Sequence, residues 1–212
     1  MVKVVSFTFN PFQENTYIVY DGSRECIIFD PGCSNIAENT KLTDFIEQNS
    51  LHPVRLINTH CHLDHIFGNK FIAEKYGLSL EIHKGELPIL THAPQSAARF
   101  GVRIEPSPEP SRFIEDEDII TFGNNTELKA ILTPGHSPAS LSFYCEAAKF
   151  IIAGDVLFHM SIGRTDLPGG DYNTLINSIK TKLLVLPDEV KVYPGHMQAT
   201  TIGYERQHNP FL

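Results

Sequence analysis

The stretch NTHCHLDHIFGN, residues 58–69, constrains the fold of this 212-residue chain more than any other feature. It places three histidines and one aspartate within six consecutive positions, shortly after the apolar run VRLI. A polar surface loop is the alternative interpretation, but imidazole and carboxylate groups at this density supply several ligands from one turn of chain, as a metal site needs. The sequence therefore predicts a buried strand that stops at Thr59 and delivers His60.

Three further segments end a predicted buried strand on a polar side chain. They are LTPGHSP, IIAGDVLF and VYPGHMQ, which present His136, Asp155 and His196, each directly after a glycine. Glycine permits a tight turn and a close backbone approach at such positions. Because strand ends on one rim of a sheet converge, we expect these three side chains to meet the histidine cluster.

The candidate ligands divide into two sets that share one carboxylate. The sets are His60, His62 and His136 for one ion, and Asp64, His65 and His196 for a second, with Asp155 as the bridge. Each ion keeps a position open for water, which is typical of catalytic sites and not of structural ones. A bridging carboxylate holds two ions about 3.5 Å apart, the separation that two-metal hydrolysis uses. We expect two divalent ions, foremost zinc, although iron and manganese suit the same mixed ligands.

Composition argues against several other classes of protein. The net charge is −8, from 25 acidic and 17 basic residues without a basic block, which disfavours a nucleic-acid surface. The longest apolar runs have the length of strands, so no membrane span is expected. Four cysteines lie scattered without C-x-x-C spacing, and the first twelve residues are typical of a strand rather than of a signal peptide, so a reducing cytoplasm is expected. We expect Cys61 to serve packing.

Hydrophobic patterning predicts clusters of strands with helices between them. Such a pattern favours an α/β fold in which two sheets pack face to face and are covered by helices, and no linker divides the chain, so one domain over residues 1–212 is expected. Residues 84–101 are expected to be partly helical with interruptions near Pro88 and Pro94, and residues 102–117 to form an exposed loop. The predicted strands are 2–9, 16–21, 25–32, 54–58, 78–83, 118–123, 127–135, 141–146, 150–158 and 191–195, and the predicted helices are 34–48, 69–77, 172–186 and 200–208.

The order H-x-H-x-D-H, then His, Asp and His, resembles that of the metallo-β-lactamase superfamily over nearly the whole chain. The resemblance implies that superfamily's fold, an αββα four-layer sandwich with the site at the rim of the sheets. The tetrapeptide FDPG, residues 29–32, resembles a further element of the superfamily, in which the aspartate matching Asp30 lies beneath the site. A turn-forming role for Asp30 before Pro31 is the alternative.

Within the superfamily, SIGRTDLPGG and the ending ERQHNPFL are similar to short glyoxalase II-like hydrolases. This resemblance implies hydrolysis of a small thioester such as S-lactoylglutathione. Antibiotic hydrolysis is disfavoured because the commonest β-lactamases carry a cysteine where this chain has Asp155. Full-length glyoxalase II also has a helical C-terminal domain, and its Lys and Tyr that contact glutathione match Arg164 and Asp166 here. Arg164 is therefore a candidate substrate-binding residue, with an ordinary surface charge as the alternative.

The expected mechanism follows from two metals. A water between two cations loses a proton near neutral pH, and Asp64 would bind one ion and help to orient the resulting hydroxide. A thioester suits such a site because its leaving thiol, with a pKa of about 8.5, needs little help from a general acid. One alternative is a persulfide dioxygenase with a single iron on His60, His136 and Asp155. Another is a non-catalytic metal-binding protein. A small-molecule partner is expected, and the sequence does not indicate an oligomeric state.

Overall fold

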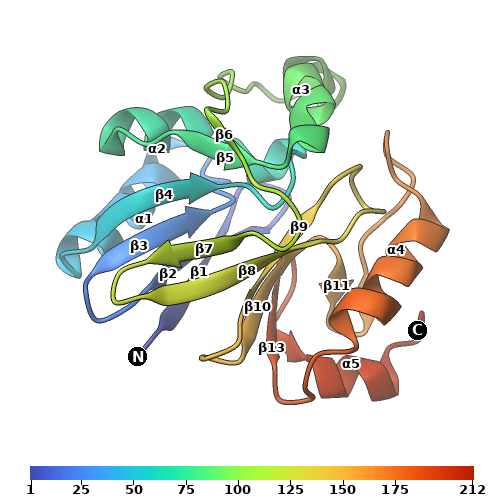
Figure 1. The fold of residues 1–212 in the computed structure, drawn as a ribbon. Coiled ribbons are helices and arrows are strands. Elements are labelled where there is room, and N and C mark those ends of the chain that lie inside the picture. The colour runs from blue at the N-terminus through green and yellow to red at the C-terminus, as the bar shows by residue number, and fades with distance from the viewer. The chain divides into compact units, whose positions relative to one another are not determined.

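The structure is a computed structural model that describes residues 1–212, and the chain forms two compact units. The first unit contains residues 1–82, 87–113 and 121–126, and the second contains residues 83–86, 114–120 and 127–212. Each unit is built around one six-stranded sheet, and the strands and helices are labelled in Figure 1. The prediction of a single domain over residues 1–212 stays a prediction.

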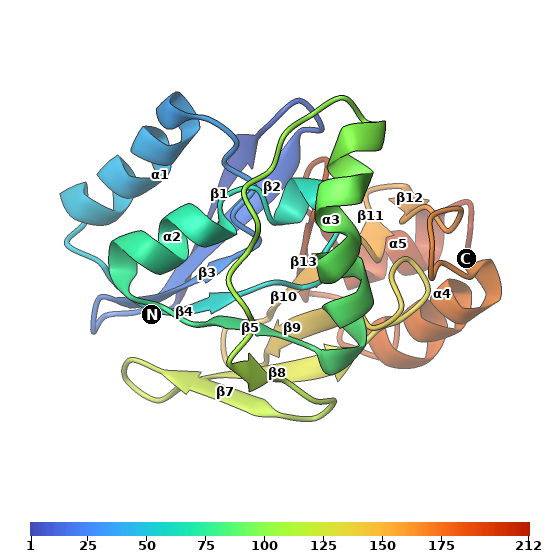
Figure 2. The same ribbon diagram turned by 90° about the horizontal axis from the view of Figure 1, so that it is seen from above.

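The sheet of the first unit is mixed. Its antiparallel part is β1–β2–β3, and β4, β5 and β6 continue from β3 in parallel. Helices α1, α2 and α3 form the connections between the successive parallel strands β3, β4, β5 and β6, and they lie on one face of this sheet (Figure 2). The bounds are β1 Lys3–Phe9, β2 Glu14–Tyr20, β3 Glu25–Phe29, β4 His52–Ile57, β5 Leu80–Ile82, β6 Arg112–Phe113, α1 Ile36–Gln48, α2 Asn69–Tyr76 and α3 Leu87–Arg99.

Burial of apolar side chains between this sheet and its helices stabilises the first unit. Leu42 of α1 and Ile72 of α2 are fully buried in one cluster with Ile18, Ile28 and Leu56 of the sheet. Complete burial of a side chain of this size contributes about 2 kcal/mol relative to exposure. The apolar residues on which the prediction of these helices rested are therefore buried in the core of the unit.

The second unit repeats this design with a different strand order, β14–β13–β10–β9–β8–β7. β10 and β13 run parallel, whereas β9 lies antiparallel to both β10 and β8. Helix α4 leads into a π-helical turn at residues 179–183, and side chains of α4 and α5 share a core cluster with β10 and β13. The bounds are β7 Ile119–Phe122, β8 Thr126–Leu132, β9 Leu141–Cys145, β10 Phe150–Gly154, β11 Leu157–Phe158, β12 Ser161–Ile162, β13 Lys191–Pro194, β14 Thr200–Thr201, α4 Tyr172–Ser178 and α5 Ile202–His208.

Three expectations from the sequence need correction. Helix α3 runs without interruption through Pro94, because burial of Ala93 and Ala97 on the same helix compensates for the hydrogen bond that proline cannot donate. Pro88 lies in the first turn, where an amide has no partner within the helix. The expected loop 102–117 contains the short strand β6, and the predicted strand 150–158 already ends at Gly154. None of the helices is both long enough and apolar enough to cross a bilayer.

Asp21, in the turn after β2, is a buried anchor within the first unit. Its carboxylate accepts hydrogen bonds from Ser23 N (2.9 Å), Asn124 N (2.7 Å) and Thr126 Oγ1 (2.8 Å). Burial alone would raise the pKa of this carboxyl, but the hydrogen bonds outweigh it and lower the pKa to about 2. The charged form of Asp21 therefore ties the segment 121–126 to the turn after β2.

Replacing Asp21 by asparagine tests this anchor. The amide offers only one acceptor oxygen, so the variant is expected to lose about 1–3 kcal/mol of unfolding free energy at pH 7. The folded-state pKa lies below the ordinary value of 3.8, so the stabilisation is present above that value and is lost as the pH falls through about 2. Urea unfolding at several pH values should show the difference between Asp21→Asn and wild type shrinking below pH 4. A difference that persists unchanged at pH 2 would contradict the ionic contribution.

Candidate metal centre

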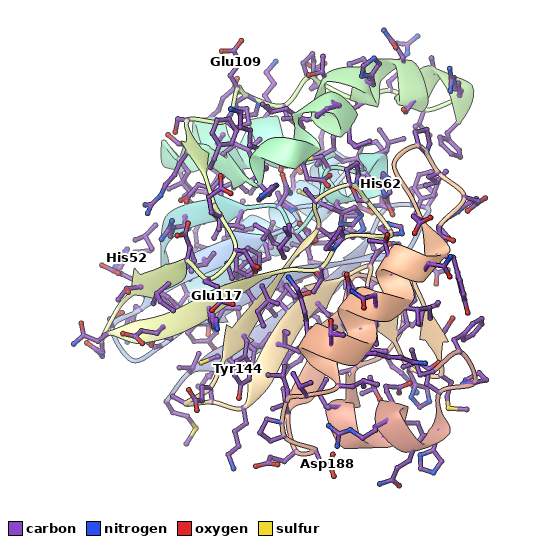
Figure 3. All side chains as sticks on the ribbon, turned by 45° about the vertical axis from the view of Figure 1, so that its right-hand side comes forward. His52, His62, Glu109, Glu117, Tyr144 and Asp188 are labelled. Carbon is purple, nitrogen blue, oxygen red and sulfur yellow. The ribbon has the colours of Figure 1, made fainter.

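The loop after β4 presents the histidine cluster in the first unit. Strand β4 ends at Ile57, and His60 and His65 are both fully buried, whereas His62 and Asp64 are partly exposed (His62 is labelled in Figure 3). The ring centroids of His60 and His65 lie 4.1 Å apart, and those of His60 and His62 lie 4.8 Å apart. The loop ends in a short 3₁₀ turn over residues 63–65, which carries the candidate ligands Asp64 and His65. The sequence motif therefore folds into one compact group of imidazoles.

Asp30 lies directly behind this group. Its Oδ1 accepts from Thr59 N at 2.7 Å, its Oδ2 accepts from Thr59 Oγ1 at 2.6 Å, and its Oδ2 lies 3.2 Å from Nδ1 of His65. The carboxylate thus contacts the histidine loop and not its own turn, as the resemblance implied for an aspartate beneath the site. Because Nδ1 of His65 faces Asp30, its Nε2 is the nitrogen that could bind a metal ion, and this atom lies 3.8 Å from Oδ2 of Asp64.

The FDPG segment packs tightly against the same loop. A Cβ atom on Gly32 would lie 2.5 Å from the carbonyl oxygen of Asp64 and 2.0 Å from Oε2 of Glu14, so only glycine fits. The side chain of Asn10 reinforces this contact, since its Nδ2 donates to the carbonyl oxygens of both Gly32 and Asp64 at 3.0 Å. The chain around Asp64 is therefore held from two sides.

Glu14 is a buried acid near the cluster that the sequence interpretation missed. It is fully buried, and its Oε1 lies 4.0 Å from Nδ1 of His65. Burial raises the pKa of Glu14 well above its usual range, although the nearby His65 opposes the shift. No sequence signal marked Glu14, because the burial of β2 along almost its whole length is a property of the folded unit.

In the second unit, His136 lies in the loop between β8 and β9. Gly135 precedes it with φ of 126°, and a Cβ atom there would lie 2.2 Å from the backbone nitrogen of Leu175. Only glycine therefore lets the loop approach α4 this closely. His136 is buried, and its Nδ1 lies 2.7 Å from the carbonyl oxygen of Arg164, which makes Nδ1 the protonated nitrogen. Nε2 is thereby left as the nitrogen that could bind a metal ion.

Asp155 and His196 follow the parallel strands β10 and β13. Gly195 N donates to the carbonyl oxygen of Gly154 at 2.8 Å, which keeps the two strand ends together. Oδ2 of Asp155 lies 3.5 Å from Nε2 of His136 and 3.5 Å from Nε2 of His196. One carboxylate oxygen thus stands between two imidazole nitrogens, which is the arrangement expected of a bridging ligand.

These donor sets fit metal ions. In the first unit, Nε2 of His65 and Oδ2 of Asp64 lie 3.8 Å apart, which is less than twice a bond length of about 2.1 Å, so one ion could bind both. In the second unit, the 3.5 Å separations at Asp155 match the edge of a coordination tetrahedron, which is roughly 3.4 Å for bonds of about 2.1 Å. Imidazole and carboxylate donors without thiolate suit zinc, iron and manganese.

The guanidinium of Arg164 already forms an ion pair within the chain. Its Nε and a terminal nitrogen bind the two carboxylate oxygens of Asp166, each at 2.7 Å, and both side chains are exposed. The hydrogen bonds to Asp166 raise the pKa of Arg164, and the same pair lowers the pKa of Asp166 to about 2. An anionic substrate would therefore compete with Asp166 for this guanidinium, while the backbone of Arg164 contacts His136.

Cys61 was expected to serve packing, and its burial agrees with that expectation. All four cysteines are buried and free, and Cys61 belongs to the core cluster of the first unit. His83 pairs with Glu115 at 3.3 Å and His159 with Glu205 at 3.5 Å.

Comparison with known proteins identifies the family. The sequence profile of the metallo-beta-lactamase superfamily matches residues 9–196. A probable metallo-hydrolase of Bacillus subtilis, YqgX, is 37% identical over 95% of this chain and 93% of its own length. The hydroxyacylglutathione hydrolase GloC of Haemophilus influenzae is 36% identical, with the same coverage. The chain therefore belongs to the metallo-beta-lactamase superfamily, and it is a metal-binding hydrolase of that superfamily.

Solved structures confirm the fold class predicted from the sequence, the αββα sandwich of the metallo-β-lactamase fold. The crystal structure of the BLEG-1 B3 metallo-beta-lactamase has a TM-score of 0.91 and 35% identity, and covers 99% of both chains. TTHA1623 in a di-iron-bound form has a TM-score of 0.87 and 35% identity, over 98% of this chain and all of the other.

Asp155→Ala should lower bound metal and activity more than His65→Ala. It removes the one carboxylate oxygen that lies 3.5 Å from Nε2 of both His136 and His196, and with it the negative charge that would offset the charge of the bound ions. His65→Ala removes a single neutral donor. Metal content by elemental analysis, together with residual activity under metal-replete conditions, measures both effects. Equal metal loss and equal residual activity in the two variants would contradict a shared ligand at position 155.

Proposed function

We propose that this chain is a two-metal hydrolase of small thioesters, with S-lactoylglutathione as the first substrate to test. The observation that carries the proposal is the single oxygen of Asp155 at 3.5 Å from two imidazole nitrogens. The proposed ligand sets are His60, His62 and His136 for one ion, and Asp64, His65 and His196 for the other, with Asp155 shared between them. Zinc is the proposed metal, and the relative with a di-iron-bound form makes iron the next candidate.

The two ions, when bound, would supply a nucleophilic hydroxide at neutral pH and stabilise the negative charge that develops on the carbonyl oxygen. The residues of the chain would prepare that chemistry. Asp30 fixes the ring of His65, the Arg164 carbonyl fixes the ring of His136, and Asp64 would orient the nucleophile. The C–S bond then breaks to leave a thiolate, which needs no dedicated general acid because thiols have a pKa of about 8.5.

Thioester hydrolysis is favoured over other activities by the relatives and by the sequence. GloC, at 36% identity, is a hydroxyacylglutathione hydrolase by name, and the chain resembles short glyoxalase II-like proteins at SIGRTDLPGG. We further propose a cytoplasmic enzyme whose partner is a small molecule and neither nucleic acid nor membrane, in keeping with the net charge of −8.

Three alternatives to thioester hydrolysis are tested alongside it. A persulfide dioxygenase would use one iron on His60, His136 and Asp155, and the tripeptide Arg164-Thr165-Asp166 is compatible with it. Hydrolysis of β-lactams is a second candidate because BLEG-1, at 35% identity, is named a B3 metallo-beta-lactamase. The commonest β-lactamases carry a cysteine at the position of Asp155, and its absence here does not bear on the B3 class. A metal-binding protein without catalysis is the third.

The decisive experiment loads the apoprotein with Zn²⁺ or Fe²⁺ and follows three reactions in parallel. We expect cleavage of S-lactoylglutathione with zinc, about two ions per chain by elemental analysis, and no oxygen uptake, because a hydrolase needs only Lewis acidity. A maximum of one ion per chain would contradict the two-metal site. Oxygen uptake with glutathione persulfide in the iron form alone would establish the dioxygenase, and turnover of a cephalosporin without thioester cleavage would establish a lactamase.

Arg164→Ala should raise KM for an anionic thioester more than it lowers kcat. A cation that holds a remote carboxylate equally in ground and transition states contributes uniform binding, which is expressed in KM. Asp166→Asn is the matched comparison: it weakens the bidentate pair and should leave Arg164 more available, so KM should fall or stay constant. A fall in kcat alone for Arg164→Ala would place this residue at the reacting centre instead.

A further inference from the structure

The loop that carries His136 is closed by its own backbone. Thr133 N donates to the carbonyl oxygen of Ser140 at 2.7 Å, and Gly135 N donates to that of Ser137 at 3.0 Å. The ring of His136 is fixed separately, by the Arg164 carbonyl. These contacts set the shape of the loop and the rotamer of the ring. The side of the loop before His136 is held on α4, since Ser178 Oγ donates to the carbonyl oxygen of Pro134 at 2.8 Å. The side after His136 needs a contact of its own.

Glu86 provides such a contact from a segment some fifty residues earlier in the chain. Its side chain is fully buried, and its two carboxylate oxygens lie 2.6 and 2.7 Å from the hydroxyl of Ser137. Oε1 also accepts from the backbone nitrogen of Ala139 at 2.8 Å. Residues 83–86 belong to the second unit, although the residues before and after them belong to the first.

The chemistry of a buried carboxylate makes this contact specific. Removing a carboxylate from water is costly unless donors replace the lost hydration, and hydrogen bonds to an ionised acceptor are about twice as strong as neutral ones. Here the donors come from Ser137 and Ala139, the residues on either side of Pro138, and Pro138 restricts the backbone of Ser137 to extended conformations. The carboxylate of Glu86 is therefore solvated best when the loop adopts this one conformation.

Close backbone packing holds Glu86 in register with the loop. A Cβ atom on Gly85 would lie 2.6 Å from Cβ of Ala139 and 3.1 Å from Nδ1 of His83. Any larger residue at position 85 would separate the segment from the loop. The carboxylate thus acts from a fixed place on the residue that directly follows His136.

We propose that Glu86 is a positioning residue for the metal centre, which holds the backbone of His136 so that its Nε2 faces the ion shared with Asp155. The effect passes through Ser137, and Glu86 touches neither substrate nor metal. This inference rests on the proposed metal centre, but it is tested by metal binding and needs no substrate. Partners outside the first coordination sphere change metal affinity about 10- to 100-fold when they are removed.

The test measures stepwise Zn²⁺ affinity by competition with a chromophoric chelator, and the visible absorption of the Co²⁺-substituted protein. Glu86→Ala should weaken one of the two binding steps about 10-fold or more, and change the Co²⁺ spectrum, because only one ion uses His136. Glu86→Gln should restore most of the affinity, since its amide oxygen accepts from Ala139 N and its NH₂ can donate to the Ser137 hydroxyl. Ser137→Ala should lie between these two.

Glu81→Gln is the matched control. Glu81 is also a buried carboxylate, but it pairs with Arg55 and Arg112 and contacts no candidate ligand. It should leave both Zn²⁺ steps and the Co²⁺ spectrum unchanged even if thermal stability falls. If Glu86→Ala does not fold, Glu86→Gln and Ser137→Ala carry the test by themselves. Wild-type affinity and spectrum in both would overturn the proposal, as would equal weakening of both metal steps.

The outcome also separates this inference from the proposed function. A wild-type protein that binds two ions, with weakened binding in the variants but no thioester cleavage, would support the role of Glu86 and contradict the thioesterase. Thioester cleavage with unaffected variants would do the reverse. A wild-type protein that binds neither Zn²⁺ nor Co²⁺ would contradict both.

Discussion

Parallel pairing of two neighbouring strands in each mixed sheet is the constraint on which the rest of the structure depends. In the first unit, β3 and β4 run parallel, so Asp30 and the histidine loop leave the sheet at the same edge. In the second unit, β10 and β13 run parallel, so Asp155 and His196 do the same. Antiparallel neighbours would send successive strand ends to opposite edges. Parallel pairing thus brings Asp30 to the histidine loop in the first unit and Asp155 to His196 in the second.

Local patterns in the sequence predicted most of this arrangement. Apolar runs that stop at a Gly–His or Gly–Asp dipeptide mark strand ends, and the structure places His136, Asp155 and His196 at such ends. Helix ends are set just as locally: Gly77 ends α2 with φ of 65°, and the side chain of Asn35 caps α1 by accepting from the backbone nitrogen of Glu38.

The sequence could not reveal contacts that depend on distant parts of the chain. Glu14 and Glu86 resemble ordinary acidic residues until the fold buries them, and the partners of Glu86 lie more than fifty positions away. Pro94 shows the same limit in reverse. Its local preference predicted a break in the helix, but burial of Ala93 and Ala97 decides the conformation. Propensity is a weak guide wherever tertiary packing offers more energy than a single lost hydrogen bond.

The rings of two candidate ligands, His65 and His136, are held in chemically different ways. Nδ1 of His65 faces the carboxylate of Asp30 at 3.2 Å, whereas Nδ1 of His136 faces the neutral carbonyl oxygen of Arg164 at 2.7 Å. An anionic partner polarises the N–H bond more strongly and makes the opposite nitrogen a better donor to a cation. A neutral carbonyl orients the ring with less electronic effect, and the anionic charge beside His136 comes instead from Asp155. In the proposed site, both ions would share the charge of Asp155, and the ion held by Asp64 and His65 would receive further negative charge from Asp64 and, behind His65, from Asp30. Such asymmetry fits a centre in which the ions serve different steps, activation of water and stabilisation of the developing oxyanion.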